Sequence, residues 1–172
     1  MSEIAVIGGG AWGTGLAIVL GRKGTHTPTH KVRLWAHETD VCQSITRKRV
    51  NEKFLPGRRI PDSVTASNDL SATLQGAQIV VSVMPSQHCR ALFERMRPHL
   101  QPRALIVSAT KGLEEGSLQR MTEVIVEVLR RADGSAPAVA ALSGPSFAQE
   151  VARGDPTRIE GLNFSQCALN VL

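Results

Sequence analysis

The chain has 172 residues, of which 42% are hydrophobic and 20% are charged, and its formal net charge is +5. This composition indicates a globular protein with one core, and aromatic residues at only 3% with no Tyr argue against a base-stacking nucleic-acid platform. No apolar run approaches the roughly 18 residues that a membrane span needs, so we expect a cytoplasmic protein without a membrane span or nucleic-acid partner.

The cysteines are too few and too widely spaced to suggest a metal site. Cys42, Cys89 and Cys167 show none of the paired spacings typical of zinc ligands. We therefore expect reduced packing thiols and no bound metal.

Apolar runs and turn signals predict an alternation of strands and helices along the chain. In chain order these are a strand over 4–7, a helix over 11–24, a strand over 32–35, a helix over 38–47, an irregular break at 54–57, strands over 79–83 and 105–108, a helix from an N-cap at Ser117 to about 131, and a strand over 138–142. This alternation predicts an α/β fold, a Rossmann-type doubly wound, mostly parallel sheet with helices on both faces.

The segments after the predicted strands carry the residues that matter for binding. In doubly wound sheets, ligands bind at the carboxyl ends of the strands. Those segments supply glycines, small hydroxyls, an imidazole and a lysine, at 8–10, 36–37, 84–86, 109–112 and 143–146. This set suits phosphates and a small polar substrate.

The glycine-rich segment 8–13 matches the G-x-G-x-x-G pattern between a predicted strand and a predicted helix. Gly8 allows the tight turn, Gly10 lets the backbone approach a pyrophosphate, and Gly13 lets helix and strand pack closely. The free N–H groups of the helix N-terminus then face the phosphates. The pattern predicts a nicotinamide dinucleotide site; the alternative is a turn with no ligand.

The end of the second predicted strand bears on cofactor choice. NAD-selective domains usually place a carboxylate there for the ribose 2′-hydroxyl. This chain has His37 at that place and Glu38 one residue later. The pattern favours NADP or use of both NADP and NAD, unless His37 is an idle surface residue.

Several segments together resemble the bacterial NAD(P)-dependent glycerol-3-phosphate dehydrogenases. They run in order as GGGAWGTGLAIVL (8–20), LWAHE (34–38), NEKFLPG (51–57), VMPS (83–86), SATKGLE (108–114) and LSGPSFAQEVARG (142–154). The resemblance implies an oxidoreductase that converts dihydroxyacetone phosphate to sn-glycerol 3-phosphate, a precursor in phospholipid biosynthesis. It also implies cofactor contacts at Ala11, Trp12, His37, Phe54, Lys111 and Ala148, and substrate contacts at Lys111, Gly144 and Ser146.

The chain departs from the family pattern at two of these positions. Ala11 stands where the family commonly has Ser or Asn, and His37 stands where Arg is frequent. The other positions are chemically reasonable. Lys111 follows a strand end, where its ammonium can meet a phosphate or polarise a carbonyl. Pro85 closes a strand where a nicotinamide could rest, whereas His88 and His99 are expected to be surface residues.

The resemblance covers a dinucleotide-binding domain over residues 1–157, followed by an atypical tail over 158–172. The tail does not match a strand that would continue the sheet. In the family, a helical substrate domain carries the acid/base lysine and an Arg-Asn pair for the substrate phosphate. We expect this chain to be a fragment that lacks that domain and is inactive alone, so no catalytic residue is assigned. The full-length form is compatible with a homodimer.

Two other functions share some of these features. A non-catalytic dinucleotide-binding or redox-sensing module would use the same glycine loop. A ketoacid or hydroxyacid dehydrogenase of another family would share that loop as well, but would not explain SATKGLE and LSGPSFAQE together.

Overall fold

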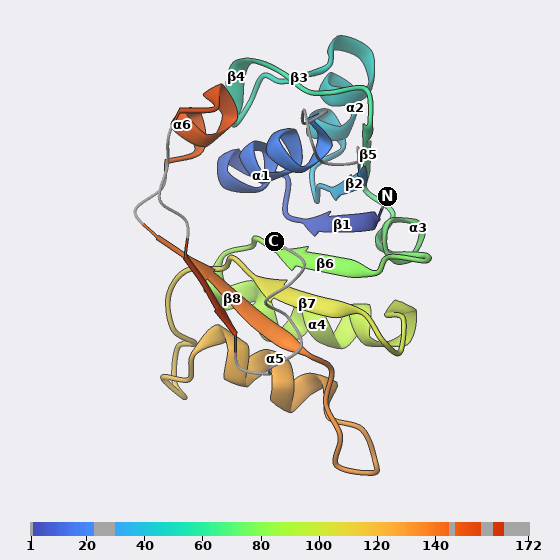
Figure 1. Ribbon diagram of the computed structural model, residues 1–172, viewed down its shortest axis with the longest axis vertical. Coiled ribbons are helices and arrows are strands. Elements are labelled where there is room, and N and C mark those ends of the chain that lie inside the picture. Colours follow the sequence, from blue (N-terminus) through green and yellow to red (C-terminus); the bar gives the residue numbers. More distant parts are fainter. Residues whose placement is uncertain (1, 23–29, 145–146, 156–159, 164–172) are drawn as a thin grey trace.

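The computed structural model describes residues 2–22, 30–144, 147–155 and 160–163, built around one central sheet (Figure 1). Within these residues the sheet has seven strands in the order β5-β2-β1-β6-β7-β8-β9. All neighbouring pairs are parallel except β8 and β9. The strands are β1 (Glu3–Ile7), β2 (Lys31–Trp35), β5 (Val64–Ser67), β6 (Ile79–Ser82), β7 (Leu105–Ser108), β8 (Val139–Ser143) and β9 (Glu160–Asn163). The expected doubly wound, mostly parallel sheet is confirmed.

Helices cover both faces of this sheet (Figure 1). The α-helices are α1 (Ala11–Gly21), α2 (Thr39–Lys48), α3 (Leu70–Leu74), α4 (Cys89–Met96), α5 (Met121–Leu129) and α6 (Ala148–Arg153), and single 3₁₀ turns cover Ser86–His88 and Arg97–His99. A separate two-stranded antiparallel hairpin consists of β3 (Val50–Asn51) and β4 (Leu55–Arg59).

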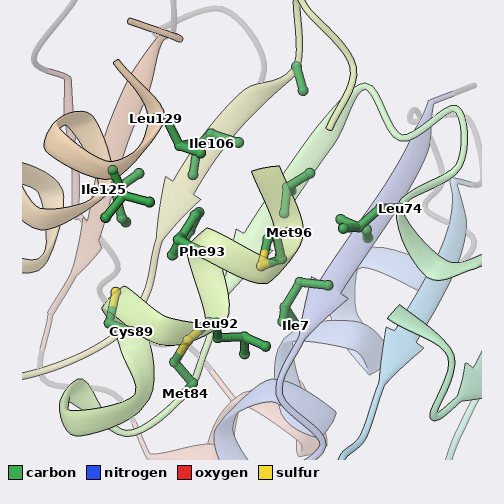
Figure 2. Close-up of a cluster of buried hydrophobic side chains, with 14 of the residues drawn as sticks. Ile7, Leu74, Met84, Cys89, Leu92, Phe93, Met96, Ile106, Ile125 and Leu129 are labelled. Carbon is green, nitrogen blue, oxygen red and sulfur yellow. The ribbon is translucent and has the colours of Figure 1, made fainter. Parts of the chain in front are cut away.

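Two apolar layers pack on the two faces of the sheet. Alternate residues of β1 divide between them, Ala5 and Ile7 entering one layer and Ile4 and Val6 the other, because successive strand side chains point to opposite faces. The first layer contains residues of α3, α4 and α5, and Figure 2 shows part of it. The second contains residues of α1, α2, the hairpin and α6.

The predicted start of the last long helix is wrong. Ser117 is not its N-cap, because α5 begins at Met121. The Ser117 hydroxyl donates to the Glu114 carboxylate at 2.6 Å and accepts from the Gln119 N–H at 3.3 Å. Leu118 has φ +56°, a left-handed conformation that cannot continue an α-helix.

Two expectations about strands are also wrong. Residues 54–57 were expected to be irregular, but Leu55 begins β4, whose partner in the hairpin is β3. The segment after residue 157 was not expected to continue the sheet, yet β9 pairs antiparallel with β8. The sheet therefore extends beyond residue 157.

The thiols of Cys42 and Cys89 are free and buried, as expected of packing cysteines, while Cys167 lies outside the described residues. Burial raises the pKa of the Cys89 thiol to about 11. No helix in the described part of the chain is long and apolar enough to cross a membrane.

Candidate functional site

The candidate site lies where the winding of the sheet reverses, between β1 and β6. The chain winds outward from β1 to β2 and β5, then returns to place β6 on the other side of β1. The Val83 N–H donates to the Ile7 carbonyl at 2.8 Å, and the Gly8 N–H donates to the Trp35 carbonyl at 3.0 Å. The carboxyl ends of three strands are thereby joined at one edge, the usual place for a ligand in such sheets.

A cavity of about 500 Å³ opens at this edge. Its lining includes the predicted residues Gly8, Gly10, His37, Phe54 and Pro85. The other lining residues are Gly9, Trp35, Glu38, Val83, Met84, His88, Ala91, Leu92 and Arg95. The structure therefore brings half of the predicted cofactor positions onto one cavity.

The glycines of the loop differ sharply in the space around them. Gly8 has φ +133°, and a Cβ there would lie 2.1 Å from the Val83 carbonyl oxygen. A Cβ on Gly13 would lie 1.9 Å from the Gly8 carbonyl oxygen, as expected for close packing of helix and strand. A Cβ on Gly10 would have no neighbour within 4 Å. Gly10 thus leaves open space beside the backbone, and this fits the close approach of a pyrophosphate.

Helix α1 begins at this loop without a side-chain cap. Its N-cap, Gly10, has extended backbone and no side chain to bond the N–H groups of the first turn. No acidic residue occupies that turn. Uncapped N–H groups and the partial positive charge of the helix N-terminus suit an anionic ligand.

The side of the cavity next to β2 carries His37, which is exposed, and Glu38, which is half-buried. Helix α4 and the turn before it supply two more basic side chains to the lining, His88 and Arg95. His88 is exposed, as expected of a surface residue, but it also lines the cavity. Arg95 was not singled out from the sequence, because nothing local distinguishes it from other surface arginines.

Phe54 reaches the cavity from the turn between β3 and β4. It is half-buried, and the Lys53 ammonium lies 5.3 Å from its ring centroid. The hairpin that carries this turn is not among the elements predicted from the sequence, although the family segment NEKFLPG (51–57) lies within it.

Lys111 lies outside the cavity lining but close to the glycine loop. Its ammonium is 5.8 Å from the centroid of the Trp12 ring, in the first turn of α1. The Thr110 hydroxyl just before it donates to the Ser82 carbonyl at 3.2 Å and accepts from the Met84 N–H at 3.4 Å. These bonds join the loops that follow β6 and β7, and so place Lys111 at the candidate site.

An ion-pair network, missed in the sequence, holds the segment that follows Lys111. The Arg90 guanidinium bonds both carboxylate oxygens of Glu114, at 2.8 and 3.0 Å, and also bonds Glu127 at 3.0 Å. These hydrogen bonds from Arg90 lower the pKa of Glu114 to about 2. Because 24 residues separate Arg90 from Glu114, no local pattern reveals the pair.

The last predicted positions lie near the end of β8. Gly144 has φ +142°, and Ser146 lies outside the described residues. Ala148 begins α6, and a Cβ on Gly15 of α1 would lie 3.1 Å from the Ala148 carbonyl oxygen. Helix α6 therefore packs closely on α1, although Ala148 and Gly144 are not part of the cavity lining.

The sheet order and the glycine loop define a Rossmann-type domain. Residues 3–161 match the family described as NAD-dependent glycerol-3-phosphate dehydrogenase N-terminus. The chain belongs to this family.

Individual relatives agree with this assignment. The chain is 55% identical over 159 residues to the glycerol-3-phosphate dehydrogenase [NAD(P)+] of Koribacter versatilis, covering 92% of this chain and 45% of the relative. It is 46% identical over 162 residues to the protein of that name from Acidobacterium capsulatum, with 92% and 46% covered. The crystal structure of glycerol-3-phosphate dehydrogenase from Coxiella burnetii matches with a TM-score of 0.81 and 38% identity, over 93% of this chain and 46% of the other.

The chain thus spans less than half the length of the relatives that it matches. Residues 3–161, which match the family, contain the glycine loop, the cavity beside it and all of the sheet except the end of β9.

Proposed function

We propose that the chain binds NADPH or NADH and forms the cofactor-binding part of a cytoplasmic glycerol-3-phosphate dehydrogenase. The reaction is the reversible reduction of dihydroxyacetone phosphate to sn-glycerol 3-phosphate. The relatives that carry this activity in their names support the proposal, and the full-length form is compatible with a homodimer.

The observation that carries the proposal is the contrast among the loop glycines. Gly8 and Gly13 have no room for a side chain because backbone atoms of the protein lie too close, whereas Gly10 faces open space. No contact within the protein requires a glycine at position 10. We therefore infer that a ligand occupies the space beside Gly10. With the uncapped N-terminus of α1 beside it, the ligand that fits is a pyrophosphate.

The remaining cofactor contacts are assigned around this loop. Phe54 and Pro85 line the same cavity as the glycines, and His37 is assigned to the adenosine ribose. Bound in this way, the dinucleotide supplies a hydride. The predicted cofactor set is completed by Ala11, Trp12, Gly13, Lys111 and Ala148.

Lys111 is assigned to the substrate as well as to the cofactor, and Gly144 and Ser146 are assigned to the substrate alone. The Lys111 ammonium can hold an anionic or carbonyl oxygen near the loop, at the side where it approaches Trp12. Reduction of a ketone also requires a proton for the developing alkoxide, and we assign that proton to no residue among these 172.

The test is oxidation of NADH or NADPH in the presence of dihydroxyacetone phosphate. The 172-residue chain is compared with a chain extended by the C-terminal half of the relative from Koribacter versatilis. The extended chain is expected to turn over faster by on the order of 10²–10⁴, the usual contribution of a positioned acid. Comparable turnover by both chains would contradict the assignment. Binding without turnover in either would favour a redox-sensing module.

A further inference from the structure

Asn51 of β3 is fully buried beneath the glycine loop, with an exposed fraction of 0%. Its amide nitrogen donates to the Gly9 carbonyl at 2.8 Å and to the Thr14 hydroxyl at 2.8 Å. Its amide oxygen accepts from the Phe54 N–H at 3.1 Å. A buried amide is costly without such partners, so these three bonds fix its orientation.

The bonds of Asn51 connect two separate walls of the cavity. Gly9 and Gly10 belong to the loop after β1, while Phe54 belongs to the hairpin turn, and all three line the cavity. Residues 9 and 51 lie 42 positions apart in the chain. The Asn51 side chain therefore sets the position of Phe54 relative to the glycine loop.

The bond to Gly9 also determines where the next N–H group points. The Gly9–Gly10 peptide is trans, like every peptide bond in the described part of the chain, and in a trans peptide the C=O and the following N–H point in opposite directions. Since the Gly9 carbonyl points to the buried amide of Asn51, the Gly10 N–H points away from it. A glycine pair has wide backbone freedom, and this bond restricts it.

We propose that Asn51 is a positioning residue for the dinucleotide. It holds the Gly9–Gly10 peptide so that the N–H group faces the pyrophosphate, and it fixes the position of the Phe54 turn relative to that peptide. This inference rests on the proposed function, and it assigns the affinity for the pyrophosphate to a side chain that does not line the cavity.

The test is calorimetric titration of the 172-residue chain and its variants with ADP-ribose, which contains the pyrophosphate and both riboses but no nicotinamide. Asn51→Ala removes all three bonds. Asn51→Asp keeps an acceptor for Phe54 but turns a second acceptor towards the Gly9 carbonyl. Each is expected to weaken binding by about tenfold or more, the scale of one or two lost hydrogen bonds. Thr73→Val is the control, because Thr73 is equally buried but bonds only within the turn at α3.

The pH dependence separates positioning from a general loss of structure. Burial raises the pKa of an aspartic acid, so the Asn51→Asp carboxyl gains a proton as the pH falls from about 8 to about 5. The protonated group can again donate to Gly9. The ratio of variant to wild-type affinity is therefore expected to rise towards one over this range. The charged groups that line the cavity, Glu38 and Arg95 among them, are common to both proteins, so their contribution cancels in that ratio.

Three results would overturn the inference. One is wild-type affinity in folded Asn51→Ala and Asn51→Asp variants. Another is an equal loss of affinity in Thr73→Val. If the Asn51 variants do not fold, Thr14→Val decides, because it removes the hydroxyl that accepts from Asn51 and that itself donates to the Gly9 carbonyl at 3.4 Å. Unchanged ADP-ribose affinity in that variant is the third result. Wild-type protein that binds no ADP-ribose would instead overturn the proposed function itself.

Discussion

The Lys111 ammonium lies 5.8 Å from the centroid of the Trp12 ring, and this contact joins the loop after β7 to the first turn of α1. The two residues come from different strand ends and approach each other because β1, β6 and β7 are adjacent in the sheet. A cation held over an indole face is attracted by the ring quadrupole. Its charge is thereby kept near the uncapped helix N-terminus, where an anionic ligand would meet both.

Replacing Lys111 tests this placement. Lys111→Met removes the charge and keeps a similar length, so dinucleotide affinity should fall several-fold while stability changes by less than about 1 kcal/mol, because the side chain is exposed. Calorimetric titration and urea unfolding measure the two effects. The matched control is Lys31→Met. Lys31 is the first residue of β2 and so lies at the amino ends of the strands, away from the cavity at their carboxyl ends. An equal loss of affinity in both variants would show that only overall charge matters.

The loop glycines are predicted to respond in opposite ways to alanine. Gly10→Ala should change stability by no more than about 1 kcal/mol. Its new methyl group would have no neighbour within 4 Å, and the cost of replacing glycine with alanine at an N-cap stays within that amount. Gly10→Ala should nevertheless weaken dinucleotide binding strongly. Gly13→Ala should destabilise the fold itself, because its Cβ would lie 1.9 Å from the Gly8 carbonyl oxygen. Thermal unfolding combined with NADH titration distinguishes them, and a Gly10→Ala variant with wild-type affinity would contradict the pyrophosphate assignment.

Cofactor selectivity is predicted to depend on His37. His37→Asp places a carboxylate at the ribose, which accepts a bond from a 2′-hydroxyl and repels a 2′-phosphate. The ratio of NADPH to NADH affinity should then fall by about tenfold or more, because opposed like charges cost several kcal/mol. His99→Asp, on the 3₁₀ turn after α4, is the control for added charge. An unchanged ratio in His37→Asp would assign His37 to the surface alone.

The Arg90 network is predicted to make stability depend on acid pH. Hydrogen bonds from Arg90 lower the pKa of Glu114 from 4.5 to about 2. A lowered folded-state pKa contributes stability above the unfolded value of 4.5, and this contribution is lost as the pH falls towards about 2. Arg90→Gln should therefore reduce the slope of stability against pH in that window. Urea unfolding of both proteins at several pH values measures it, and parallel slopes would contradict the prediction.

The glycine loop and the strand ends could be predicted because their signals are local. A buried strand, three glycines and a helical pattern follow one another directly from Ile4 onwards, and the structure places β1, the loop and α1 there.

The elements that hold the site together could not be predicted, because their partners are far apart in the chain. Asn51 bonds Gly9, and Arg90 bonds Glu114, and neither spacing corresponds to a helix or hairpin pattern. The prediction that Ser117 is the N-cap of the last long helix is wrong for a related reason. Ser117 has the chemistry of an N-cap, but its hydroxyl bonds Glu114 while Arg120 and Glu123 bond each other at the actual start of α5.

The most direct test of the account is a calorimetric titration of the folded 172-residue chain with NADPH and with NADH. The account predicts saturable binding of one molecule per chain, with quenching of protein fluorescence because Trp12 lies beside the glycine loop, in the first turn of α1. Addition of ADP-ribose should displace the bound dinucleotide. A folded chain that binds neither dinucleotide with a Kd below about 1 mM, which corresponds to roughly 4 kcal/mol, would contradict it.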